Sequence, residues 1–139
     1  MARSQQERVQ WSLQKAREYL ESAQDNILAE RRYPAAEDIF RSVETGLTTL
    51  IYNAGITSIE YRNWDGTLTG RLAHQSLVRE TLFRAGIISN EEYQTYLNLV
   101  NNLHYEGYRP GKVFEMNELI EYAEFAENLL IKITSIISE

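Results

Sequence analysis

The feature that most constrains the fold of this chain is an apolar residue at every third or fourth position, maintained over several long stretches. In residues 4–30 these positions follow the spacing of one face of an α-helix, and they are Val9, Leu13, Ala16, Leu20, Ala23 and Ile27. A helix of this length gains little stability from its own propensity, so its apolar stripe must pack against other helices. The pattern therefore predicts a helical protein.

Breaks in this period divide the chain into five predicted helices, at about residues 4–30, 34–53, 72–85, 89–104 and 116–138. Pro34 suits the first turn of the second helix, where its missing N–H is not needed, and Gly86 is a typical C-terminal stop for the third. Residues 57–70 have no clear period and are predicted to form a loop. We expect one all-α domain over residues 1–139, an antiparallel up-and-down bundle of four or five helices.

The fourth helix has the clearest local signal. Ser89 followed three residues later by Glu92 has the form of a capping box, in which each side chain satisfies a backbone N–H at the helix start. The row of side chains that follows at helical spacing consists of Tyr93, Leu97, Val100 and His104. This row predicts that His104 lies on the packed face, near the end of the helix.

Composition excludes several classes of protein. The chain has no Cys, which removes disulfides, thiolate nucleophiles and Cys-ligated metals and is typical of a reducing compartment. We find no signal peptide and no apolar run of membrane-spanning length, so we expect a cytoplasmic protein without a membrane span. The net charge of −6 argues against broad electrostatic adhesion to nucleic acid.

The familiar nucleotide and hydrolase motifs are absent from the sequence. It contains no Walker loop, no dinucleotide fingerprint and no Gly-x-Ser-x-Gly elbow. A di-iron bundle would need a Glu three residues before a His, and neither His74 nor His104 has one. We therefore expect no metal site and no cofactor.

Chemistry is expected to concentrate in residues 101–111, where the helical period ends and polar, aromatic and basic side chains gather. His104 is the candidate catalytic residue, because an imidazole exchanges protons near neutral pH. Tyr105, Tyr108 and Arg109 are candidate ligand-binding residues, because Tyr rings stack on bases and Arg binds phosphate. Structural roles are open for all four, since a His also suits a helix C-terminus and aromatic and Arg residues suit a subunit interface.

Four segments resemble one known family in sequence and order. They are Tyr33-Pro34-Ala35-Ala36 with the helix that follows, His74-Gln75-Ser76-Leu77, Ala85-Gly86-Ile87-Ile88-Ser89 and His104-Tyr105-Glu106-Gly107-Tyr108. Together they resemble the HEPN family (higher eukaryotes and prokaryotes nucleotide-binding). The resemblance implies a homodimer of helical bundles, often encoded beside a minimal nucleotidyltransferase, and in many members an RNase that acts as a toxin.

The chain departs from the RNase motif of that family. Those RNases have an Arg, four to six further residues and then a His, and the pair binds phosphate and assists attack by the ribose 2′-hydroxyl. The allowed Arg positions hold Leu99, Asn98 and Leu97 before His104, and Thr69, Leu68 and Thr67 before His74. Arg109 follows His104 and would have to reach back from the turn. The loss matters because phosphoryl transfer depends on stabilising negative charge.

We therefore expect a HEPN-like dimeric binding or regulatory module. It would act with a nucleotidyltransferase partner in a toxin–antitoxin-like system and contact RNA or a nucleotide through the turn. The alternative is a metal-independent ribonuclease that uses His104 with an Arg from outside the motif. In related two-component systems the nucleotidyltransferase modifies a Tyr two residues after the motif His. That position is Glu106 here, so the turn is expected to be a docking or ligand surface instead.

Overall fold

The computed structural model describes residues 3–139. In chain order its elements are α1 (Arg3–Leu28), α2 (Arg32–Asn53), β1 (Glu60–Asn63), β2 (Gly66–Thr69), α3 (Gly70–Leu77), the π-helical η1 (Val78–Phe83), α4 (Asn90–Leu99), the π-helical η2 (Val100–Tyr105), the 3₁₀-helical η3 (Glu106–Tyr108) and α5 (Met116–Ile137). The prediction of a mostly helical chain is confirmed.

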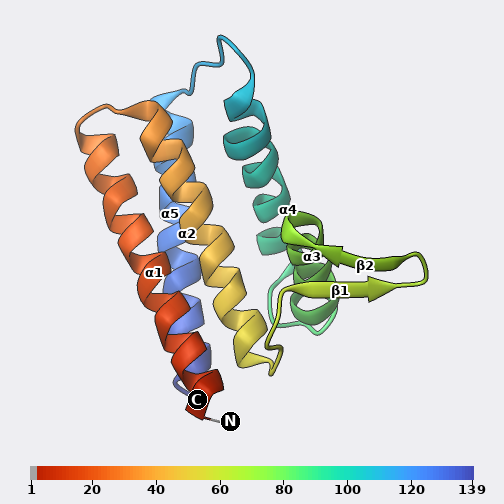
Figure 1. Ribbon diagram of the computed structural model, residues 1–139. Helices are drawn as coiled ribbons and strands as arrows, with labels where there is room; N and C mark the ends of the chain where they lie inside the picture. Colours follow the sequence, from red (N-terminus) through yellow and green to blue (C-terminus); the bar gives the residue numbers. More distant parts are fainter. Residues whose placement is uncertain (1–2) are drawn as a thin grey trace.

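The helices α1, α2 and α5 form the larger part of the fold. α1 and α2 pack side by side along their length, and α5 packs against both of them (Figure 1). The predicted apolar stripe of α1 is buried from Val9 to Ala23, as a helix packed on two neighbours requires. On its other side α2 contacts η1 and η2, so side chains of α2 reach both the main core and the segment that contains His104.

Small and hydroxyl side chains let these helices approach closely. The Ser12 and Thr49 hydroxyls share a buried 2.8 Å hydrogen bond, and the Ser42 hydroxyl donates to the Ala16 carbonyl oxygen at 2.8 Å. A Cβ atom at Gly46 would lie 2.9 Å from Leu130 Cδ2, closer than side-chain carbons normally approach. These hydrogen bonds and the close approach at Gly46 therefore fix the position of α2 relative to α1 and α5.

Residues 57–70 were predicted to form a loop, and most of them form a β-hairpin instead. β1 and β2 pair antiparallel, from Glu60 opposite Thr69 to Asn63 opposite Gly66. The hairpin projects from the helices in Figure 1, and Trp64 at its turn is 94% exposed. Gly70 follows with a φ of 64°, which turns the chain directly into α3. The hairpin therefore determines where Arg71, the next residue, enters the fold.

The capping box that opens α4 is confirmed. Ser89 Oγ accepts from the Glu92 backbone N–H at 3.0 Å, and Glu92 Oε1 accepts from the Ser89 backbone N–H at 2.7 Å. The predicted third and fourth helices each end in a π-helical turn, η1 and η2, rather than continuing as regular α-helix. No helix within residues 3–139 combines the length and apolar character needed to cross a membrane.

Candidate functional site

His104 lies in η2, near the end of the segment that begins as α4. As predicted, it is on the packed face, with only 7% of its surface exposed. Its ring stacks on the ring of Phe40 from α2, with centroids 4.4 Å apart and planes 18° from parallel. Single π-helical turns within helices are frequent at functional sites. The candidate site lies where η2 packs against α2.

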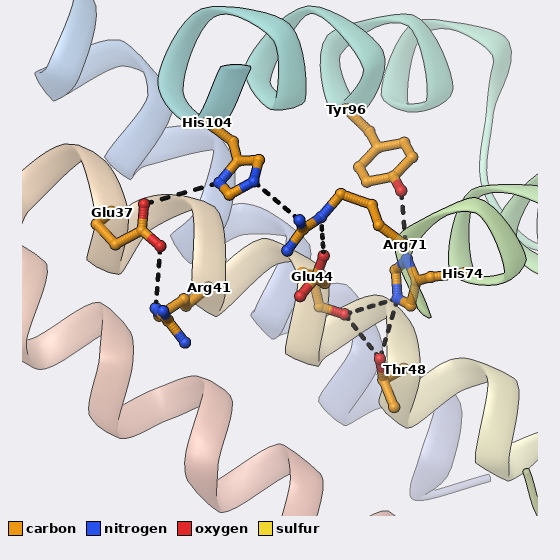
Figure 2. Close-up of polar contacts among 8 residues, drawn as sticks. All are labelled: Glu37, Arg41, Glu44, Thr48, Arg71, His74, Tyr96 and His104. Carbon is orange, nitrogen blue, oxygen red and sulfur yellow. Dashed lines mark hydrogen bonds and ion pairs between the residues drawn. The ribbon is translucent and has the colours of Figure 1, made fainter. Parts of the chain in front are cut away.

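An arginine from α3 contacts this histidine. Arg71 Nη1 lies 2.8 Å from His104 Nε2, and Arg71 Nε donates to Glu44 Oε2 at 3.1 Å (Figure 2). The guanidinium carbon also lies 4.8 Å from the centroid of the Phe40 ring. The motif positions before His104 hold no Arg, yet the fold supplies one from 33 residues earlier in the chain.

The Arg71 contact determines the protonation state of His104. A guanidinium group can only donate hydrogen bonds, so Nε2 is the acceptor and His104 is neutral, with its proton on Nδ1. Burial and then the charge of Arg71 lower the pKa of His104 below its ordinary value, against the opposing effect of Glu37 and Glu44. The neutral form is consequently the stable one near neutral pH.

The Nδ1 atom of His104 faces a carboxylate. It is buried and has no hydrogen-bond partner among the described residues, and Glu37 Oε2 lies 3.8 Å from it. The other oxygen of Glu37 pairs with Arg41 Nε at 3.2 Å, one helical turn along α2. A cleft of about 340 Å³ opens here, and its aromatic and charged lining comprises Tyr33, Glu37, Arg41, His104, Tyr108 and Phe114.

Two of the three predicted ligand-binding residues lie beside His104. The rings of Tyr105 and Tyr108 meet the imidazole edge-on, with centroids 5.3 and 5.0 Å away, and both side chains are at least half exposed. Arg109 pairs instead with Glu106 at 3.2 Å and has a side chain that is 65% exposed. The fold therefore brings the two tyrosines to the histidine and leaves Arg109 outside the cluster.

His74 belongs to a separate, buried network. Its Nε2–H points at the Glu44 carbonyl oxygen, 3.1 Å away, and at the Thr48 hydroxyl, while the Tyr96 hydroxyl donates to its Nδ1 at 3.3 Å. Burial lowers the pKa of His74 and raises that of Tyr96, so both are neutral. Because both ring nitrogens are occupied, His74 anchors α3 to α2 and α4 and has no nitrogen left for chemistry.

Comparison of the chain with protein-family models, with curated proteins and with solved structures finds no match. What the site can do therefore follows from its geometry. Among residues 3–139, no group of three or more His, Asp and Glu side chains is arranged to hold a metal ion. The available chemistry is anion binding by Arg71 and proton exchange at His104, and exchange at Nε2 requires Arg71 to move away.

Sequence reasoning did not place Arg71, Glu37, Glu44 or Phe40 at the site. One signal was available, because Glu37, Arg41 and Glu44 recur at spacings of four and three on α2, beside its buried row. Charged residues at the edge of a packed face need partners, and an Arg one turn before His74 was a candidate. The sequence did not show which helix would deliver that partner.

Proposed function

We propose that the chain is a HEPN-like bundle that binds a phosphate group of RNA or of a nucleotide beside His104. The observation that supports this most is the Arg71 guanidinium held against His104. Two of its five N–H donors are used, one by Glu44 and one by His104, and three are left. Its side chain is 32% exposed, and a guanidinium fork matches the geometry of phosphate oxygens.

The surroundings of His104 suit a nucleic-acid ligand. Tyr105 and Tyr108 present exposed rings beside His104, and such rings stack on bases without requiring a particular sequence. The resemblance to HEPN proteins supports the remainder of the proposal. In it, the chain is a cytoplasmic homodimer that acts as a binding or regulatory module with a minimal nucleotidyltransferase partner in a toxin–antitoxin-like system.

The direct test is binding of a fluorescein-labelled RNA octamer in which every 2′-hydroxyl is methylated, so that it cannot be cleaved. Arg71→Gln is expected to weaken binding by about 10- to 100-fold, because a charge-assisted contact to phosphate contributes about 1.5–3 kcal/mol. Fluorescence anisotropy at low salt measures the affinity.

Arg84→Gln is the matched control for this test. Arg84 also pairs with a glutamate, Glu80 at 3.2 Å, but its side chain is 64% exposed, against 32% for Arg71, and it caps the C-terminal end of η1. Loss of one surface charge there should change affinity about twofold or less. Equal weakening in the two variants would mean that only net charge matters, and the proposed phosphate site would be rejected.

The homodimer is a separate prediction. Light scattering at tens of micromolar protein should give twice the chain mass of 16.2 kDa. The exposed aromatic residues of the turn, Tyr105 and Tyr108, are of the kind that interfaces enrich. A single species of monomer mass under these conditions would contradict the dimer. It would not bear on the phosphate site, which the RNA-binding experiment tests separately.

A second candidate function is a metal-independent ribonuclease, which the Arg71–His104 contact favours because it provides the Arg that the motif lacks. Against it, in the ligand-free protein Nε2 accepts a hydrogen bond from Arg71 and Nδ1 carries the proton, so neither nitrogen offers a free lone pair for a general base. We expect no cleavage of unmodified RNA in the presence of a chelator. Cleavage that His104→Ala abolishes with the fold intact would replace the first function by the second.

A further inference from the structure

The two ring nitrogens of His104 face groups of opposite charge. Nε2 lies 2.8 Å from Arg71 Nη1, and Nδ1 lies 3.8 Å from Glu37 Oε2. The titratable and charged groups around the imidazole are Glu37 and Glu44 on α2, Arg71 on α3, Tyr105 on η2 and Tyr108 on η3. The histidine side chain is 9% exposed, so protein groups rather than water surround most of the imidazole.

The contact between Arg71 and His104 can exist only while the imidazole is neutral. If Nε2 were protonated, two cationic donors would face each other 2.8 Å apart. Once the guanidinium had turned aside, a phosphate oxygen could accept from Arg71 Nη1 and from a protonated Nε2. The single contact would then be replaced by two charge-assisted hydrogen bonds to one anion.

We propose that Glu37 is the positioning residue of this site: it faces the Nδ1–H of His104, so that Nε2 takes up a proton when a phosphate group binds. This inference rests on the proposed function. The proton comes from the solvent and adds to the Nε2 lone pair, and no covalent bond of the ligand changes. Arg71 keeps its Nε contact with Glu44 and turns its terminal nitrogens to the phosphate.

Glu37 rather than Glu44 has the right position for this role. Glu44 Oε2 is occupied by Arg71 and lies on the Nε2 side of the ring. Glu37 is held by Arg41, which binds Oε1 at 3.2 Å and leaves Oε2 facing Nδ1. A positive charge on the imidazole would therefore lie between the ligand phosphate and the Glu37 carboxylate, and it would draw that carboxylate into hydrogen-bonding distance.

The ligand-free protein gives the first test. Nitrogen-15 NMR should show His104 as the Nδ1–H tautomer. Glu37→Gln should lower the pH midpoint of its titration, since the counter-charge is lost, and Arg71→Gln should raise it. Asp38→Asn is the matched control, because Asp38 is the next residue on α2 and accepts from Ser22 and Asn26. An Nε2–H tautomer, or a midpoint unmoved by Glu37→Gln, overturns the inference.

The second test follows the proton during binding. Calorimetric titration of the methylated octamer, in two buffers of different ionisation enthalpy, should show net uptake approaching one proton per site above the free-state midpoint of His104. In that pH range the affinity for the octamer should fall as pH rises, by up to about tenfold per pH unit. Glu37→Gln should remove most of the uptake and flatten this pH dependence, whereas Asp38→Asn should change neither.

The outcomes separate the inference from the function on which it rests. Binding that depends on Arg71 but takes up no proton overturns the role of Glu37 and leaves the phosphate site standing. Binding that ignores Arg71→Gln overturns the proposed function and the inference with it. A Glu37→Gln variant that loses stability but keeps full proton uptake assigns Glu37 a structural role only, which also overturns the inference.

Discussion

Replacement of Phe40 by Ala is expected to lower the free energy of unfolding by about 3–5 kcal/mol, the usual range for a large buried side chain. Phe40 is 1% exposed and lies in the main core. Its ring also stacks on His104 at 4.4 Å and lies 4.8 Å from the Arg71 guanidinium carbon. Urea denaturation followed by far-ultraviolet circular dichroism measures the loss.

A second substitution separates packing from the support of the site. Phe40→Leu retains an apolar side chain, so it should lower the free energy of unfolding by less than Phe40→Ala does. It nevertheless removes the flat ring surface that contacts His104 and Arg71. Its octamer affinity should fall. Leu47→Ala is the converse control, because Leu47 is as well buried on the same helix but lies about two turns beyond Phe40. Wild-type affinity in Phe40→Leu would show that the ring supports only the fold.

The helices could be predicted from the sequence because their signals are local. The stripe on α1 repeats at three and four residues, so its buried face follows from the helical period alone. The capping box at Ser89 is equally local, since both of its hydrogen bonds join residues three apart. The β-hairpin gave no comparable signal, because its strands have four residues each and leave most of their side chains exposed.

The site could be predicted only in part for the same reason. His104 continues an apolar row of its own helix, so its burial followed from spacing. Arg71 reaches it through a contact between residues 33 apart, which depends on how the hairpin turns into α3 and how the side chains of α3 meet Glu44 on α2. A contact between residues so far apart in the chain leaves no repeating pattern in the sequence, so it could not be predicted from periodicity. Arg109 is near in sequence but pairs with Glu106 within the turn, so proximity along the chain was misleading here.

Acidification from about pH 7.5 to about pH 5 is expected to destabilise the protein, because its two histidines are both buried. Burial is the largest cause lowering the pKa of His74 and of His104. In the unfolded chain a His titrates near pH 6.5, so below that pH the unfolded state binds more protons than the folded state. Stability therefore falls as pH falls, by up to about 1.4 kcal/mol per pH unit for each histidine that stays neutral.

Urea denaturation at a series of pH values measures this slope, and single variants divide it between the two histidines. His74→Gln should flatten the slope most, because the His74 ring is enclosed by Glu44, Thr48 and Tyr96. His104→Gln should flatten it less, since Glu37 and Glu44 favour the protonated form of His104 and oppose its burial. Above about pH 7.5 neither histidine contributes, because both states are then neutral. A flat profile, or stability that rises on acidification, would contradict the buried neutral state of both rings.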